Sequence, residues 1–159
     1  LVGSEMCIRD RNRGGVRIFR YLDQSGKMGF GRFDQEGNTF LILQKGDGDF
    51  EATDERITPF QFLTPIDFRC IYAIGLNYRA HARETGLEVP KYPMVFMKAP
   101  TATQNPGDPI VLPRYLRSDK VDFEGELGVV IGRPCKNVEP EEALSYVLGY
   151  VCALSLIHI

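Results

Sequence analysis

The segment "VDFEGELGVVIG", residues 121–132, carries the carboxylates with the clearest chemical potential. Glu124 and Glu126 interrupt an otherwise apolar run, and Asp122, to which we assign no ligand role, precedes them. Strand residues two apart share one face at a spacing of about 6.6–6.8 Å, so two long glutamates can converge. Converging carboxylates need a cation or a proton between them, because like charges raise each other's pKa. The pair suits a hard cation such as Mg²⁺ or Mn²⁺, and the alternative is a solvated strand face.

Two further segments carry candidate catalytic groups. In residues 77–86, whose pattern predicts a short helix, His81 and Glu84 are three apart and share a helical face. A glutamate that accepts a hydrogen bond from imidazole fixes its tautomer and raises its basicity, which suits a general base. A chance pair on a surface helix is the alternative. Lys98, at the end of the predicted strand 94–98, either contacts a substrate or extends into water.

The two ends of the chain have a common peculiarity. "MCIRDR" (Met6–Arg11) and "LSLIHI" (Leu154–Ile159) can be encoded by one short DNA read on opposite strands. That DNA matches a transposon-based sequencing adapter. We therefore interpret residues 1–11 and 154–159 as adapter-derived tails that flank a gene fragment, and we expect them to make few packing contacts.

Composition excludes several classes of protein. A net charge of −2 without a basic cluster argues against a nucleic-acid partner. No apolar run approaches the ~20 residues of a membrane helix, which predicts no membrane association. Outside the predicted tails, the pattern of Cys70, Cys135 and Cys152 predicts buried free thiols in a reducing compartment, hence a cytoplasmic protein.

The elements that must position these residues are mostly strands, which predicts a mixed, β-rich α+β fold. Residues 12–66 have the pattern of a small β-meander domain, which ends in a proline-containing linker, 58–66. Residues 67–153 form a second predicted domain, and the boundary between the two lies near Pro65. Asn77 and Gly86 are the predicted caps of the short helix. The predicted strands are 16–22, 28–33, 39–43, 70–76, 94–98, 110–112, 121–132 and one that starts at 148; a second helix is predicted over 139–147, after a turn at 105–109.

Five segments of the second domain, in this order, resemble the fumarylacetoacetate hydrolase family. They are "IGLNYRAHARETG", "PMVFMKAPTAT", "GDPIVLP", "KVDFEGELGVVIG" and "EEALSYVLGYVCA". The resemblance covers residues 71–153. It implies the first part of the family's β-roll or barrel catalytic domain, and the preceding meander is similar to the small N-terminal domain of many members.

The resemblance implies a role for each candidate residue. Glu124 and Glu126 match the family's metal ligands, which bind Mg²⁺ or Mn²⁺. His81 and Glu84 match a His-x-x-Glu pair on the active-site lid, and Lys98 matches a lysine that contacts substrate. The family's third metal ligand is an aspartate just after a strand that resembles "GYVCA", where this sequence enters the predicted adapter.

The resemblance further implies a cytoplasmic, homodimeric parent enzyme that hydrolyses a C–C bond. Its substrate would be a small β-dicarbonyl or 2-oxo acid, similar to an acylpyruvate or fumarylacetoacetate. The same site could instead serve 2-oxo acid decarboxylation or keto–enol isomerisation. We expect the fragment itself to be inactive, and an alternative of another class is a non-catalytic β-rich fragment or binding module.

Overall fold

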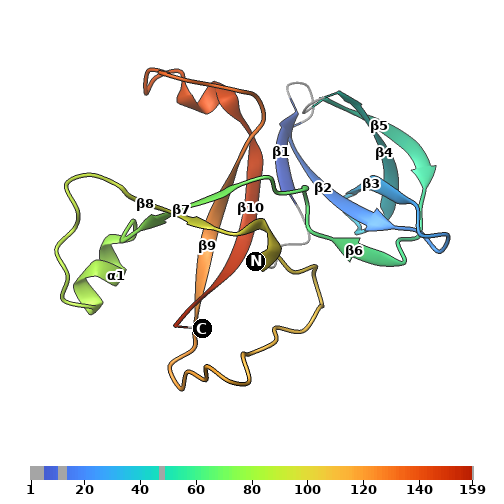
Figure 1. The fold of residues 1–159 in the computed structure, drawn as a ribbon. Coiled ribbons are helices and arrows are strands. Elements are labelled where there is room, and N and C mark those ends of the chain that lie inside the picture. Colours follow the sequence, from blue (N-terminus) through green and yellow to red (C-terminus); the bar gives the residue numbers. More distant parts are fainter. Residues whose placement is uncertain (1–5, 11–13, 47–48, 159) are drawn as a thin grey trace. The chain divides into compact units, whose positions relative to one another are not determined.

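The structure, a computed structural model, describes residues 6–10, 14–46 and 49–158 (Figure 1). The chain divides into two compact units, residues 1–66 with 104–159 and residues 67–103, and each is described by itself. Among the described residues, no helix has the length and apolar character needed to cross a membrane. The elements are β1 (Met6–Asp10), β2 (Gly14–Leu22), β3 (Met28–Phe33), β4 (Thr39–Gly46), β5 (Asp49–Arg56), β6 (Gln61–Leu63), β7 (Ile71–Gly75), α1 (Arg79–Glu84), β8 (Met94–Lys98), the 3₁₀ helix η1 (Pro100–Ala102), β9 (Asp122–Ile131), the 3₁₀ helix η2 (Ala143–Tyr146) and β10 (Val147–Ile157).

The first unit is built on one antiparallel sheet. Its strand order is β5-β4-β3-β2-β1-β10-β9, and β6 pairs with β2. The predicted β-rich fold and the meander strands 16–22, 28–33 and 39–43 are confirmed in β2, β3 and β4. Gly26 and Gly37 have φ of 81° and 84°, the positive values that tight turns require. The sequence analysis missed β5, and the predicted linker contains β6.

Aromatic packing stabilises the meander. Phe19 of β2 is 0% exposed, and its ring centroid lies 4.4 Å from that of Phe33 and 5.1 Å from that of Phe62. Gly31 of β3 faces this cluster, where a Cβ would lie 2.5 Å from a ring carbon of Phe19. The glycine thus lets β3 approach the ring closely, and full burial of such an aromatic residue contributes about 1.5–3 kcal/mol.

The terminal segments pack into the sheet, so the expectation of few contacts is wrong. β1 pairs with both β2 and β10, and Met6 is 0% exposed in a core with Val130 and Val151. Residues 154–157 continue β10 and pair with β9. Both segments are rich in apolar residues, which can pair as strands whatever their coding origin. Their adapter origin stays a prediction, and the side chain of Ile8 is outside the described residues.

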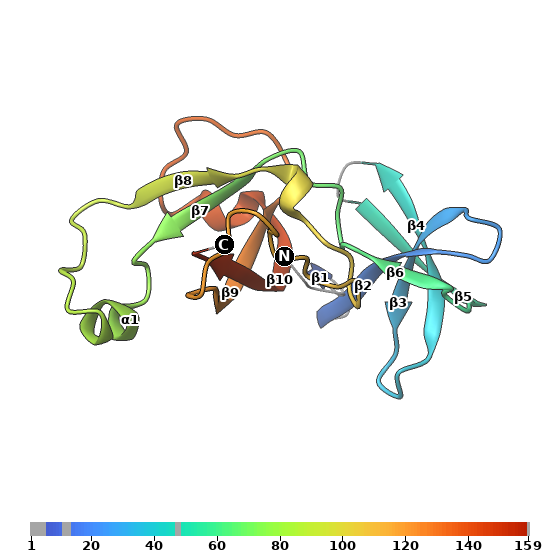
Figure 2. The same cartoon turned by 60° about the horizontal axis from the view of Figure 1, so that its bottom comes forward.

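The second unit contains a hairpin and a short helix (Figure 2). β7 and β8 pair antiparallel, from Ile71 opposite Lys98 to Gly75 opposite Met94. The helix α1 begins later than predicted: Tyr78 is its N-cap without a side-chain hydrogen bond, so the prediction of Asn77 as the cap is wrong. Gly86 follows the helix with φ 67°, the left-handed geometry expected there.

Two other predicted elements differ from the structure. Residues 110–112 form no strand, because Pro109 and Pro113 flank them and lack the backbone N–H that a sheet ladder requires. Residues 139–147 contain only the 3₁₀ helix η2, preceded by turns such as the one in which the Glu142 N–H donates to the Glu139 carbonyl at 3.0 Å.

The prediction of buried thiols is also wrong. Cys70, Cys135 and Cys152 are all exposed free cysteines. Cys152 shows the reason, because it alternates along β10 with the buried Val151 and therefore points to the opposite face of the sheet.

Candidate metal and catalytic site

The acidic residues of β9 lie on its more protected face. Glu124 and Glu126 are half-buried, and the same face continues to Val130, which is 7% exposed. The alternating residues of the other face are exposed, although they are apolar. An ordinary amphipathic strand has the reverse arrangement. The geometry therefore disfavours the interpretation of these glutamates as a solvated strand face.

Ser155 of β10 joins the same face. It lies directly opposite Glu124 in the β9–β10 ladder, while Ala153 lies opposite Glu126. Ser155 is 2% exposed, and its Oγ is buried without a hydrogen-bond partner in the described residues. A buried hydroxyl without a partner costs about 1–3 kcal/mol, so Ser155 occupies this position at an energetic cost.

These donors fit a hard cation in part. Glu124 and Glu126 supply two carboxylates, and directly opposing strand residues have Cβ atoms about 4.5–5.5 Å apart, which places position 155 within reach of a shared ligand. Among the described residues, no group of three His, Cys, Asp or Glu side chains is arranged to hold a metal ion. Sequence reasoning did not single out Ser155, although it placed the family's third ligand just after "GYVCA".

The predicted base pair lies on α1. His81 and Glu84 are both exposed residues of this helix. Ala82, 1% exposed, anchors the helix, and the Thr85 N–H and Oγ1 close its end by donating to the His81 carbonyl at 3.0 and 2.9 Å. The helix therefore fixes the backbone of His81, while the orientation of its ring by Glu84 stays a prediction.

Lys98 is the last residue of β8 and is half-buried. It pairs with Ile71 across the hairpin, and its Nζ lies 5.8 Å from the centroid of the Phe96 ring. Contact with an aromatic face is compatible with a retained positive charge. His81, Glu84 and Lys98 belong to the second unit, whereas the two glutamates belong to the first. The common site of these residues thus remains a prediction.

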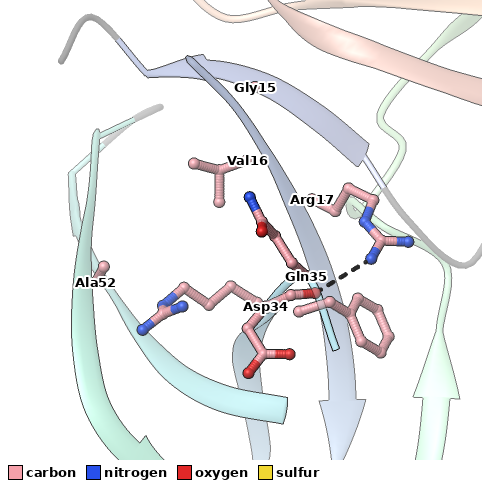
Figure 3. A pocket seen from close by; sticks show the side chains of 8 residues that line it. Gly15, Val16, Arg17, Asp34, Gln35 and Ala52 are labelled. Atoms are coloured by element: carbon pink, nitrogen blue, oxygen red, sulfur yellow. Dashed lines mark hydrogen bonds between the residues drawn. The ribbon is translucent and has the colours of Figure 1, made fainter. Parts of the chain in front are cut away.

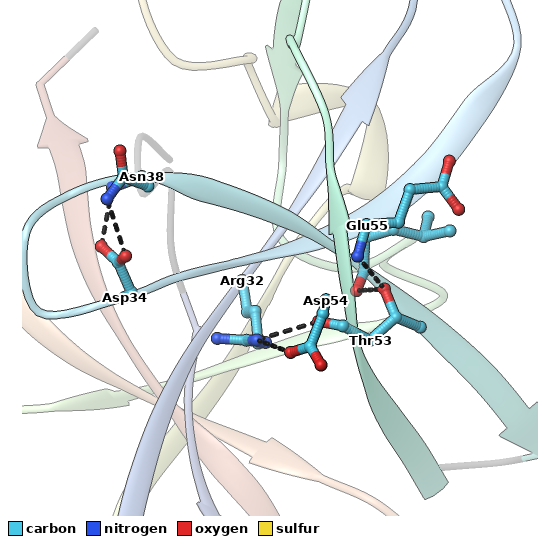
Figure 4. A network of polar contacts seen from close by, with 7 residues as sticks. Arg32, Asp34, Asn38, Thr53, Asp54 and Glu55 are labelled. Atoms are coloured by element: carbon cyan, nitrogen blue, oxygen red, sulfur yellow. Dashed lines mark hydrogen bonds and ion pairs between the residues drawn. The ribbon is translucent and has the colours of Figure 1, made fainter.

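A separate cavity of about 310 Å³ lies in the meander (Figure 3). Its lining includes Arg32, Asp34 and Gln35, and no predicted site residue. Two contacts within the meander fix the side chain of Arg32. One of its Nη atoms donates a hydrogen bond to the Thr53 carbonyl at 2.9 Å (Figure 4), and its guanidinium carbon lies 4.7 Å from the Phe40 ring centroid. These contacts account for Arg32 as a residue that packs within the meander.

Comparison with known proteins identifies the class. Residues 70–156 match the model of the fumarylacetoacetate (FAA) hydrolase C-terminal family. The chain is 53% identical over 81 residues to a 2,4-didehydro-3-deoxy-L-rhamnonate hydrolase of Sphingomonas sp., covering 51% of this chain and 28% of that one. It is 34% identical over 150 residues to a caffeoylpyruvate hydrolase of Neonothopanus nambi, covering 87% of this chain and 51% of that one.

A solved structure supports the same assignment. The 2-hydroxyhepta-2,4-diene-1,7-dioate isomerase of Mycobacterium marinum has a TM-score of 0.72 and 29% identity, covering 89% of this chain and 54% of that one. The proteins that this chain resembles therefore include two named as hydrolases and one named as an isomerase. The chain belongs to the fumarylacetoacetate hydrolase family. It spans about half the length, or less, of these relatives.

Proposed function

We propose that the chain is part of a divalent-metal-dependent enzyme that hydrolyses a C–C bond in a 2-oxo acid or β-dicarbonyl compound, similar to an acylpyruvate. The observation that carries the proposal is the protected acidic face of β9, where Glu124 and Glu126 accompany a buried position 155. The names of the relatives, which include a caffeoylpyruvate hydrolase, support the substrate class. We expect this chain alone to be inactive, because it offers two of three carboxylate ligands.

In this proposal, Glu124 and Glu126 hold Mg²⁺ or Mn²⁺ on the protected face. A bound divalent cation would polarise the oxygens of the oxo acid and stabilise negative charge there. The positions of the two carboxylates determine where the cation can stabilise negative charge. The buried residues around them limit the access of water to that place. No side chain on this face other than the glutamates carries charge along residues 124–130 of β9.

His81 takes the role of general base. Its imidazole removes a proton from the water that attacks the carbonyl carbon, and Glu84 orients the ring and stabilises the resulting imidazolium. As the C–C bond breaks, the imidazolium returns this proton to the carbon of the leaving enolate. The ammonium of Lys98 compensates the carboxylate of the substrate or the charge that develops on its carbonyl oxygen.

A related reaction at the same site is the second candidate. An isomerase of Mycobacterium marinum shares the fold, so keto–enol isomerisation, or decarboxylation of a 2-oxo acid, also suits the proposed ligands. Neither reaction needs an activated water. The dependence on His81 therefore distinguishes hydrolysis from these alternatives.

The test uses the full-length coding sequence. The purified protein is assayed with an acylpyruvate, a 2-oxo diacid and a dienol, with and without Mg²⁺ or Mn²⁺. Metal-dependent release of pyruvate from the acylpyruvate, abolished by Glu126→Ala, is the expected result. Turnover that persists in excess chelator, or in the Glu126→Ala variant, would exclude the proposed role of the acidic face. Gel filtration with light scattering tests the homodimer, and fractionation tests the cytoplasmic location.

A further inference from the structure

The second unit is an insertion, so the chain leaves the first unit once and returns to it once. Residues 67–103 form the insertion, and the residues on both sides of it belong to the first unit. The insertion carries α1 with the predicted catalytic pair, His81 and Glu84. Its attachment depends on two segments of the first unit, which we call the outgoing connection (64–66) and the returning connection (104–109).

The outgoing connection is firmly anchored. It directly follows β6, which pairs with β2 in the main sheet. Pro65 is buried, and Ile66 packs against the core cluster that contains Met6. The Thr64 hydroxyl also donates to the Ile66 carbonyl at 3.1 Å. The outgoing connection is therefore a fixed point of the first unit.

The returning connection is held differently. Residues 103–121, all of them described, contain neither helix nor strand. The Asp108 N–H donates to the Asn105 carbonyl at 3.1 Å, which closes a turn within the connection. The Gln104 side-chain amide donates to the Pro109 carbonyl at 3.3 Å, also within the connection. These two bonds shape the segment, but neither reaches another strand.

The side chain of Asn105 makes the distant contact. Its Oδ1 accepts the Thr64 N–H at 3.1 Å, across 41 positions of the sequence. An asparagine at the start of a turn commonly bonds to the backbone of its own turn. Here the backbone closes the turn, so the side chain serves another segment. Both residues are half-buried, which limits competition from water. The Thr64–Asn105 bond thus joins the returning connection to the anchored outgoing one.

We propose that Asn105 is a positioning residue, which restricts the insertion by tying its two connections together. The catalytic consequence rests on the proposed function, because that proposal assigns the roles of His81 and Lys98. Without the Asn105 acceptor, the local bonds at Gln104 and Asp108 remain, and the insertion keeps one firmly anchored connection. It then samples a wider range of orientations. A misplacement of about 1 Å can slow a reaction ~10²-fold, so the wider range lowers kcat.

Two measurements on the chain test the tie without any activity. Nitroxide labels are placed on Cys152 of β10 and, through Arg83→Cys, on α1, with the other cysteines replaced by serine; both positions are exposed. Asn105→Ala should broaden the distribution of distances between the labels and speed amide exchange of Thr64 roughly 2- to 10-fold. Asn105→Asp keeps the acceptor oxygen and should restore both wild-type values. Gln104→Ala is the matched control: it removes a local bond and should change neither.

Kinetics of the full-length enzyme test the catalytic consequence. Asn105→Ala should lower kcat for hydrolysis about 10-fold or more, and Asn105→Asp should restore it. Mn²⁺ affinity should stay unchanged, because Glu124 and Glu126 lie outside the insertion.

Equal distance distributions in wild type and Asn105→Ala would overturn the tie, and an unchanged kcat in an active enzyme would overturn the positioning role. If the full-length protein hydrolyses no 2-oxo acid, the proposed function fails, whereas a broadened distribution still supports the tie and an equal one still overturns it. If Asn105→Ala does not fold, Asn105→Leu, which has a similar shape and lacks the acceptor, takes its place in both experiments.

Discussion

Replacement of Gly128 by alanine should destabilise the protein by overpacking the protected face of β9. A Cβ at Gly128 would lie 2.5 Å from Cγ2 of Val151 and 3.4 Å from its carbonyl oxygen. Val151 is 8% exposed and packs with Met6 and Val130, so it has little room to move. Its β-branched side chain is also stiff at χ1.

The magnitude follows from two opposing effects. Overpacking of a core costs about 1–3 kcal/mol. Loss of glycine's freedom in the unfolded chain returns about 0.4–1 kcal/mol. The net loss expected for Gly128→Ala is therefore about 1–2 kcal/mol. Gly125 is the matched control in the same strand, because a Cβ there meets nothing within 4 Å. Gly125→Ala should leave stability unchanged or raise it by about 0.5 kcal/mol.

Urea denaturation of the full chain, followed by circular dichroism, measures both variants. With a slope near 2 kcal/mol/M, Gly128→Ala should lower the midpoint by about 0.5–1 M relative to wild type. Equal midpoints would mean that Val151 does not pack against Gly128, and the register of β9 on β10 would then be wrong. That register also places position 155 opposite Glu124, so its failure would remove the geometric basis of the metal site.

Three further predictions concern acid stability and the catalytic pair. The Asn38 amide, 2.7 Å from Asp34, holds the pKa of Asp34 below its ordinary value, so Asp34→Ala should lower the urea midpoint at neutral pH. This contribution is present above the ordinary pKa and is lost as pH falls through the lowered one, so a gap to wild type that does not narrow as pH falls would contradict it. In the full-length enzyme, His81→Ala should slow hydrolysis by roughly 10²–10⁴ with unchanged metal affinity; unchanged hydrolysis would remove His81 from the mechanism. Glu84→Gln should slow the same step and alter its pH profile, whereas an unaltered profile would exclude its orienting role.

Much of the strand content was predictable, because alternation of apolar and polar residues is a local property. The period of two in "VDFEGELGVVIG" correctly gave a strand with both glutamates on one side. The pattern could not show which side is protected, since burial depends on the partner strand β10. The exposed stripe at Leu127 and Val129 contradicts the usual expectation that apolar faces are buried.

Other features depend on contacts between distant parts of the chain. Met6 is buried only because β1 pairs with both β2 and β10, which no local pattern indicates. Ser155 is relevant to the proposed metal site only because the register of β10 on β9 places it opposite Glu124. The predicted cap at Asn77 is wrong by one position: Tyr78 is the N-cap and the helix begins at Arg79, so Asn77 precedes the capping position.

Introducing a carboxylate at position 155 tests the central claim most directly. The claim is that Glu124, Glu126 and position 155 form a divalent-cation site on the protected face of the sheet. Isothermal titration calorimetry with Mn²⁺ compares the full chain, Ser155→Asp and the double variant Ser155→Asp with Glu126→Gln. Ser155→Asp should bind one Mn²⁺ at least ~10-fold more tightly than the unmodified chain, because a third carboxylate joins the other two. Loss of that binding in the double variant is predicted, and equal Mn²⁺ affinity in all three proteins would contradict the account.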